Sequence, residues 1–174
     1  MSKILSIIIP IYNEEQIIPE LYKRLSESAQ EITTDYELIF INDGSLDNSL
    51  LELMKLSNED EKVFFINFSR NFGHQIAVTA GIDHCTGNAV VIIDGDLQDP
   101  PELIVTMYQK YKEGYDVVYA QREKRDGESF FKKTTAKLFY KLLKKLTSVD
   151  IPLDTGDFRL IDRKIVEALK MMPE

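Results

Sequence analysis

Residues 90–93 form a run of four β-branched side chains, and two aspartates separated by a glycine follow it directly. Such a run is typical of a strand that is buried on both faces, as in a parallel sheet. In open α/β sheets, ligands bind beyond the carboxyl ends of the strands. We therefore expect Asp94 and Asp96 to lie where a ligand would bind, with Gly95 allowing the chain to turn tightly between them.

The two aspartates predict a metal site. Like charges this close repel each other, and a hard divalent cation relieves the repulsion by binding carboxylate oxygens. Mg²⁺ or Mn²⁺ would keep positions open for water and for substrate phosphates. The alternative is that the aspartates only form a turn and cap the next helix. That cap is expected from three residues: Asp99 as N-cap, Pro100 as first helical residue and Glu102 as capping-box partner. Because one helix needs only one cap, this alternative explains the aspartate pair poorly.

The rest of the chain alternates strand and helix patterns. Strands are expected at residues 4–9, 37–41, 63–67, 90–93 and 116–120. Apolar residues at helical spacing predict helices between them, and a short strand after Asp157 followed by a closing helix ends the chain. This alternation predicts an α/β fold in which helices flank a Rossmann-like, mostly parallel sheet, as a single domain over residues 1–174.

Composition and missing motifs argue against several classes of protein. A chain of 174 residues can bury a core, and its net charge of −8 makes it a poor candidate for nucleic-acid binding. The one cysteine, Cys85, cannot form an internal disulfide and is expected to be a structural thiol at a helix end. The loop at residues 10–15 lacks the glycines of a dinucleotide fold, and no Walker lysine motif is present. A bound nucleotide would therefore be held by carboxylates, backbone groups and a metal.

Asp43, Asp157 and several residues between 70 and 75 are further candidates for the site. Asp43 ends the second strand at the same edge as Asp94, where it could accept hydrogen bonds from a base or a ribose, or could simply belong to a turn. Arg70, Asn71, His74 and Gln75 could line the floor of the site, or residues 71–74 could simply begin a helix. A lone histidine is more often structural, and we do not assign His74 as a base. Asp157 could reach the site or be another turn aspartate.

Residues 129–149 differ in character from the rest of the chain. They contain six lysines and no acidic residue. Helical spacing would place most of these lysines on one side and apolar residues on the other, the pattern of a basic amphipathic helix on an anionic membrane surface. The alternative is an ordinary surface helix that packs its apolar side on the domain.

Taken together, the motifs at residues 9–15, 42–45 and 94–96 resemble those of family 2 glycosyltransferases with the A-type fold. The motifs at 69–75, 96–102 and 155–160 resemble, more narrowly, those of the polyprenyl-phosphate glycosyltransferases. That group includes dolichyl-phosphate mannose synthases and bactoprenol glucosyltransferases. The resemblance covers nearly the whole chain.

The resemblance implies a role for each set of residues. The residues expected to hold the nucleotide are Pro10, Tyr12, Glu14 and Asp43. Those expected to bind Mg²⁺ or Mn²⁺ and the diphosphate are Asp94, Asp96 and Gln98. The residues expected to act in catalysis are Asp96, Arg122, Lys137 and Asp157, of which Arg122 and Lys137 would contact the lipid phosphate.

The implied function is inverting transfer of a hexose from a nucleoside diphosphate sugar, such as UDP-glucose, to a polyprenyl phosphate at the cytoplasmic face of the membrane. A lipid phosphate is already anionic at neutral pH, so no strong general base is required. Bactoprenol-type members usually continue into two membrane-spanning helices, and we expect this chain to be truncated before them. The oligomeric state, including a homo-oligomer, stays open.

Other functions are weighed beside this one. The closest is a family 2 enzyme that acts on a sugar or glycan acceptor with Asp157 as base. A phosphatase with a D-x-D motif would use Asp94 as nucleophile, but the pair lies mid-chain and Gln98 is not the expected small hydroxyl neighbour. A sugar-nucleotide-binding module without catalysis is the third.

Overall fold

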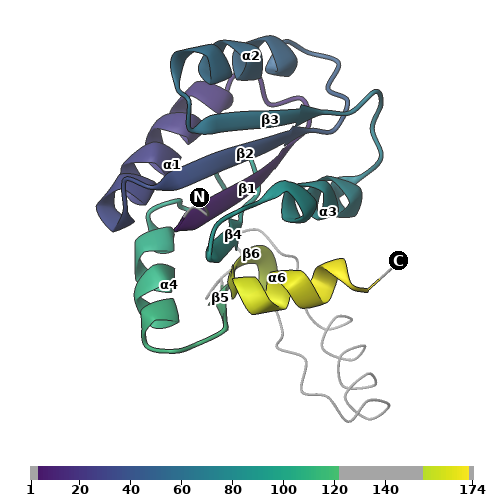
Figure 1. Ribbon diagram of the computed structural model, residues 1–174. Coiled ribbons are helices and arrows are strands. Elements are labelled where there is room, and N and C mark those ends of the chain that lie inside the picture. Colours follow the sequence, from purple (N-terminus) through teal and green to yellow (C-terminus); the bar gives the residue numbers. More distant parts are fainter. Residues whose placement is uncertain (1–3, 122–154, 173–174) are drawn as a thin grey trace, which may run out of the picture. The chain divides into compact units, whose positions relative to one another are not determined.

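The computed structural model describes residues 4–121 and 155–172 (Figure 1). The predicted basic helix at 129–149 and the predicted site residues Arg122 and Lys137 lie outside the described residues. Contacts divide the chain into two compact units, Met1–Tyr119 with Asp157–Glu174, and Ala120–Gly156. The core and the site described below belong to the first unit.

Within the described residues, the sheet has six strands in the order β3-β2-β1-β4-β6-β5. Their bounds are β1 Leu5–Ile11, β2 Tyr36–Asn42, β3 Val63–Asn67, β4 Ala89–Ile92, β5 Val117–Gln121 and β6 Thr155–Asp162. β1 pairs in parallel with β2 and β4, β2 pairs in parallel with β3, and β6 runs antiparallel to β4. The predicted α/β class and the mostly parallel sheet are therefore confirmed.

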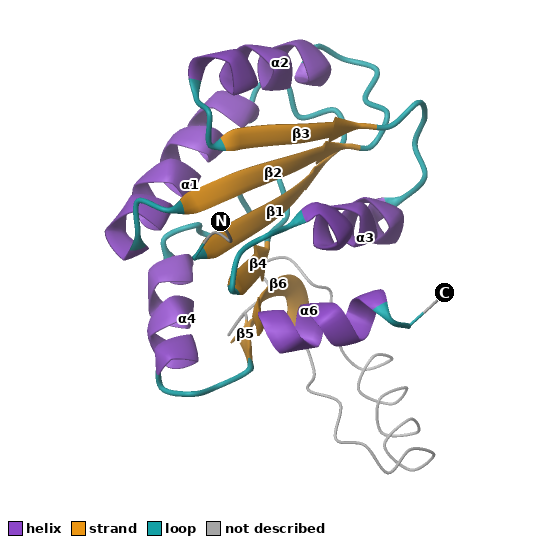
Figure 2. Ribbon diagram, in the orientation of Figure 1, coloured by secondary structure: helices purple, strands orange, loops and turns teal. Residues whose placement is uncertain are grey.

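Helices cover both faces of this sheet (Figure 2). Their bounds are α1 Ile18–Ile32, α2 Ser49–Glu59, α3 His74–His84, α4 Leu103–Lys112 and α6 Arg163–Lys170. α1 contacts α2 and α4 on one face, and α3 contacts α6 on the other. No helix among these residues combines the length and the apolar character that crossing a bilayer requires.

The central strands are buried on both faces, as the run at 90–93 predicted. Successive side chains of a strand point to opposite faces of the sheet. Ile8 and Val90 join the apolar cluster beneath α3 and α6, so Ile7 and Val91 point to the opposite face, and all four are fully buried. β1 and β4 therefore form a rigid centre from which the loops at their carboxyl ends project.

The predicted cap of α4 is wrong. The helix begins at Leu103, later than predicted, and Asp99 is not its N-cap. A proline disfavours helical backbone in the residue before it, so Pro101 prevents Pro100 from starting the helix. Glu102 is itself the N-cap residue, and its carboxylate accepts two hydrogen bonds from the Arg24 guanidinium, at 2.7 and 2.8 Å.

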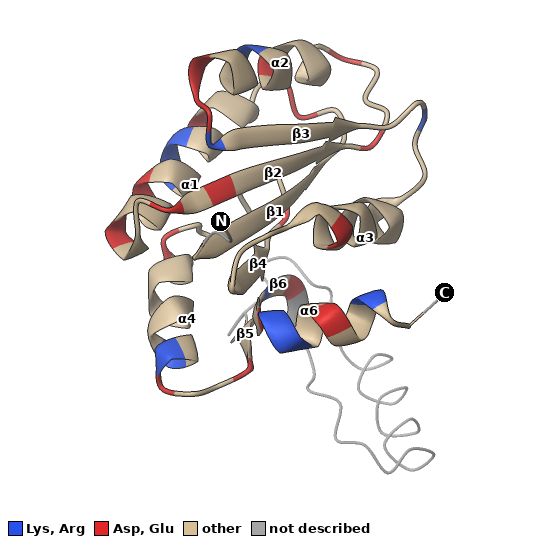
Figure 3. Ribbon diagram, in the orientation of Figure 1, with Lys and Arg blue, Asp and Glu red and all other residues tan. Residues whose placement is uncertain are grey.

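Acidic residues occur on α1, α2, α3 and α6 (Figure 3). They therefore do not gather on one helix or one face of the sheet.

Candidate functional site

A cavity of about 260 Å³ opens at the carboxyl ends of β1, β2 and β4. Six residues predicted from the sequence line it, namely Pro10, Tyr12, Glu14, Asp43, Asp94 and Asp96. Ile11, Asn71, His74, Ala77 and Gly95 complete the lining. The strand order reverses between β1 and β4, and such switch points are where open α/β sheets bind ligands.

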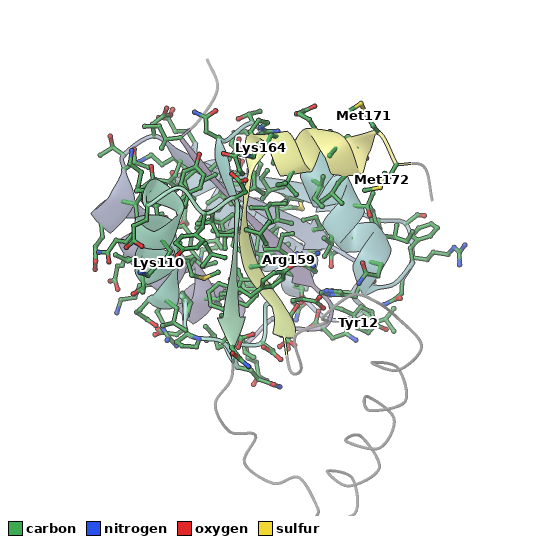
Figure 4. The ribbon with its side chains drawn as sticks, turned by 90° about the horizontal axis from the view of Figure 1, so that it is seen from below. Tyr12, Lys110, Arg159, Lys164, Met171 and Met172 are labelled. Carbon is green, nitrogen blue, oxygen red and sulfur yellow. The ribbon has the colours of Figure 1, made fainter. Side chains whose placement is uncertain are left out.

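Tyr12 marks the rim of the cavity on the β1 side. Tyr12 is 44% exposed, and its side chain is labelled in Figure 4. Glu14, two residues later, lies deeper, and burial together with the charges of Asp96 and Asp47 raises the pKa of its carboxyl group. The loop after β1 thus presents an aromatic face and a carboxylate to the same cavity.

The loop after β1 is fastened to the loop after β2 by reciprocal hydrogen bonds. The backbone amides of residues 13–15 donate to side-chain oxygens of the second loop, at Ser45 (2.9 Å), Ser49 (2.9 Å) and Asp47 (3.1 Å). In return, the Leu46 amide donates to Asn13 Oδ1 at 2.7 Å. Asn13 has a φ of 58°, which asparagine tolerates better than most residues. This network explains why both loops are rich in short polar side chains.

Asp43 is buried and its carboxylate is engaged by the protein itself. Its two oxygens accept hydrogen bonds from the backbone amides of Phe72 (2.7 Å) and Gly73 (3.0 Å). The neighbouring Gly44 has a φ of 66°, and a Cβ there would lie 2.2 Å from the carbonyl carbon of Arg70. Asp43 therefore fixes the loop before α3 while lining the cavity, and its role toward a nucleotide stays a prediction.

The turn after β4 differs from the predicted one. Leu97, not Gly95, takes the left-handed conformation, with a φ of 57°. Glycine is needed at 95 for space, because a Cβ there would lie 2.9 Å from the Pro10 carbonyl oxygen and 2.5 Å from the Ile11 side chain. The backbone at this position packs directly on the end of β1, which fixes the aspartates on either side.

The two aspartates after β4 occupy different environments. Burial raises the pKa of the Asp94 carboxyl group; the charge of His74 opposes this shift, and those of Asp157 and Asp96 add to it. Asp96 Oδ1 accepts a hydrogen bond from the Gln98 amide at 3.0 Å, which orients its carboxylate. Gln98 itself is not among the residues that line the cavity.

Asp157 does not line the cavity but lies next to the lining residue His74, where β6 places it. Because β6 lies antiparallel beside β4, its first residues lie at the same edge of the sheet as Asp94. His74, the first residue of α3, stands between the two carboxylates. Its Nδ1 is 3.8 Å from Asp94 Oδ1 and its Nε2 is 3.1 Å from Asp157 Oδ2. The sequence predicted His74 only as one residue that could line the floor of the site, and it does line the cavity. Its place in the motif at residues 69–75 is the only sequence signal for a further role.

The chain belongs to glycosyltransferase family 2. The model of this family, "Glycosyl transferase family 2", matches residues 6–170. Membership removes the support for the phosphatase alternative, which rested on the D-x-D pattern alone.

Curated relatives match nearly all of the chain. The protein named "Uncharacterized glycosyltransferase YkcC" of Bacillus subtilis (strain 168) is 58% identical over 97% of this chain and 52% of its own length. The "Prophage bactoprenol glucosyl transferase homolog" of Escherichia coli (strain K12) is 42% identical over 98% of this chain and 56% of its own length. The chain thus spans about half the length of the relatives it matches.

Solved structures share the fold. The mannosyltransferase PcManGT from Pyrobaculum calidifontis, in complex with GDP-Man and Mn²⁺, superimposes with a TM-score of 0.67 at 20% identity and covers 99% of this chain and 48% of that one. Glucosyl-3-phosphoglycerate synthase from Mycobacterium tuberculosis with UDP gives a TM-score of 0.62 at 20% identity, with 94% and 58% coverage. These likenesses confirm the predicted glycosyltransferase A-type fold.

Proposed function

We propose that this chain transfers a hexose from a nucleoside diphosphate sugar, such as UDP-glucose, to a polyprenyl phosphate at the cytoplasmic membrane face, with inversion at the sugar. The proposal rests on one observation: the Asp94–Asp96 pair and the loops bearing Glu14 and Asp43 line the same cavity. The relatives named as bactoprenol glucosyl transferases support the choice of acceptor.

The donor set of the cavity fits a divalent metal. Asp94 and Asp96 offer carboxylate oxygens, the ligands that Mg²⁺ and Mn²⁺ prefer. Burial raises the pKa of Asp94, and the charges of Asp157 and Asp96 add to this shift, so a bound cation would favour the ionised carboxylate. When bound, the metal would supply a Lewis acid to the departing diphosphate. Tyr12 and Asp43 would position the nucleoside beside it.

The acceptor side requires cations rather than a base. A lipid phosphate is already a nucleophilic anion, and bringing it to an anionic donor needs positive charge. Arg122 and Lys137 are proposed for this role. The basic segment 129–149 is proposed to hold the chain at an anionic membrane surface, where each lysine would contribute about 1 kcal/mol.

The proposal is tested by transfer of labelled glucose from UDP-glucose to a short polyprenyl phosphate in the presence of Mn²⁺ or Mg²⁺. Asp96→Ala should abolish transfer while the circular dichroism spectrum stays native. Asp83→Ala, a change at an exposed aspartate of α3 outside the cavity, is the matched control and should retain transfer. Undiminished turnover by Asp96→Ala would reject the role of the acidic pair. UDP binding without transfer to any acceptor would favour the non-catalytic alternative.

A second candidate is transfer to a sugar or glycan hydroxyl, and the position of Asp157 favours it. A hydroxyl acceptor needs a general base, and Asp157 lies beside the cavity, with its Oδ2 3.1 Å from Nε2 of the lining residue His74. Removing a general base typically costs 10²- to 10⁴-fold, roughly, in rate. Asp157→Asn should therefore lose transfer to glycan acceptors by about that factor if this candidate is right, and assay with both acceptor classes separates the two functions.

A further inference from the structure

We propose that His74 is a nitrogen ligand of the divalent metal, and that it completes a protein ligand set with Asp94 and Asp157. The inference rests on the proposed function, because it concerns the metal of the same site. It extends that site beyond the aspartate pair after β4, to a residue of α3 and a residue of β6.

The geometry brings three ligand-type atoms together from three elements. One nitrogen of His74 and one carboxylate oxygen each of Asp94 and Asp157 lie within 4.8 Å of one another. Opposite ligands of an ion bound at about 2.1 Å are about 4.2 Å apart, so small side-chain rotations would close the set. The positions of these three side chains are fixed by the packing of the elements that carry them. α3 packs on β1, β4 pairs with β1, and β6 pairs with β4.

While the His74 imidazole is neutral, which is the form that binds a metal, one of its nitrogens has no hydrogen-bond donor facing it in the described part of the chain. A neutral imidazole donates from one nitrogen and accepts at the other, yet both nitrogens of His74 face carboxylates. Among the described residues, Nε2 is enclosed and makes no well-aligned hydrogen bond, although Asp157 Oδ2 lies 3.1 Å away. An ion that takes a nitrogen lone pair and two carboxylate oxygens would satisfy all three side chains.

The ligand set predicts a preference among metals. Mg²⁺ takes oxygen ligands almost exclusively, whereas first-row transition ions accept imidazole more readily. A site with one imidazole and two carboxylates should therefore favour Mn²⁺ over Mg²⁺. Asp96 stays available on the same loop to contact the metal or its water, so the inference adds ligands to the predicted site.

The decisive measurement is electron spin echo envelope modulation of bound Mn²⁺, which detects a directly coordinated imidazole nitrogen. The chain contains two histidines, so in the His84→Ala variant an imidazole signal can come only from His74. His84 is a suitable control because it is exposed and its ring contacts only the Ala80 carbonyl among the contacts described. The full chain, prepared without a histidine tag, is measured with Mn²⁺ alone and with Mn²⁺ and UDP.

We expect nitrogen coupling in the unaltered chain and in His84→Ala, and its loss in His74→Gln. His74→Gln should also weaken Mn²⁺ binding by about tenfold or more and Mg²⁺ binding by less. Bound Mn²⁺ without nitrogen coupling in His84→Ala overturns the inference even if His74→Gln fails to fold. Mn²⁺ that binds together with UDP but shows no nitrogen coupling leaves the proposed aspartate site standing. If neither Mn²⁺ nor UDP binds, both proposals are rejected.

Discussion

Single side chains at the carboxyl ends of the strands serve two purposes at once. Asp43 binds two backbone amides and also lines the cavity, so the residue that would face a nucleotide also fixes the loop carrying the start of α3. Asp96 likewise accepts an amide of its own loop while facing the cavity. Preorganisation of this kind lets carboxylates keep their geometry before any cation or ligand arrives.

Asp43→Asn tests the structural half of that role. The amide nitrogen of asparagine would face one of the two backbone N–H groups, leaving a partly buried donor without its acceptor. The cost of such a group is about 1–3 kcal/mol of unfolding free energy. Urea unfolding should show this loss, with Asp83→Asn on the surface of α3 as the control that stays near the unaltered chain. Equal midpoints for all three proteins would contradict the structural role.

Cys85 is predicted to be chemically silent in the folded protein. It is buried at the end of α3, and burial raises the pKa of its thiol, so little reactive thiolate forms near neutral pH. Labelling with iodoacetamide at pH 8 should be slow in buffer and fast in denaturing urea. Rapid labelling without denaturant would show that α3 opens at this end.

At the residue scale, sequence reasoning succeeded where local pattern decides position. A buried strand followed by Asp94-Gly95-Asp96 placed both carboxylates, because the end of a strand is visible in the sequence itself. From the sequence, His74 is no more than one residue that could line the floor of the site, because its partner Asp157 comes from a strand far along the chain. Nothing local to residue 74 indicates that β6 will lie beside β4.

At the scale of elements, helices are tied to their neighbours by pairs that local rules do not foresee. α4 is held to α1 by Glu102 and Arg24 rather than started by Asp99. α6 begins at an N-cap, Asp162, whose side chain accepts from the Lys164 amide at 2.9 Å and from the Tyr111 hydroxyl at 3.0 Å. One carboxylate thus starts α6 and fastens it to α4.

The bond from Tyr111 to Asp162 gives a stability prediction at alkaline pH. Burial, followed by this hydrogen bond, raises the pKa of Tyr111 from 10.0 to about 12. The unfolded chain releases the phenolic proton near pH 10 and the folded chain only near pH 12, so this contribution is complete below pH 10 and is lost as pH rises toward 12. Urea unfolding at pH 9 and 11 measures the loss.

The loss between the two pH values should be smaller in Tyr111→Phe, which has no proton to release. Tyr115→Phe, at a tyrosine that is 59% exposed, is the control and should keep the full loss. The same pH dependence in all three proteins would mean that Tyr111 is not held in its neutral form by the fold.

At the scale of the whole sheet, the order of strands decides which residues meet. The alternating pattern predicted a parallel sheet, and this is confirmed for β1 to β4, although β1 runs two residues beyond its predicted end, to Ile11. The pattern does not say that β6, the last strand in sequence, inserts between β4 and β5 and runs antiparallel to β4. That insertion brings Asp157 to the edge of the sheet that holds Asp94. The position of Asp157 near the site therefore follows from long-range packing and not from local sequence.

Chelation of divalent metal tests the cavity as a unit. Asp94, Asp96 and Glu14 give it a negative lining, and a diphosphate carries the same sign, so nucleotide binding should depend on the metal. With Mn²⁺, UDP at 100 times its dissociation constant should stabilise the fold by about 2.7 kcal/mol, a rise in melting temperature of about 5 °C or more. With EDTA the rise should vanish, and Mn²⁺ alone gives the reference against which UDP is measured. An equal rise in melting temperature with UDP in EDTA would show that protein groups alone hold the diphosphate. The proposed role of the acidic residues in binding a metal would then be rejected.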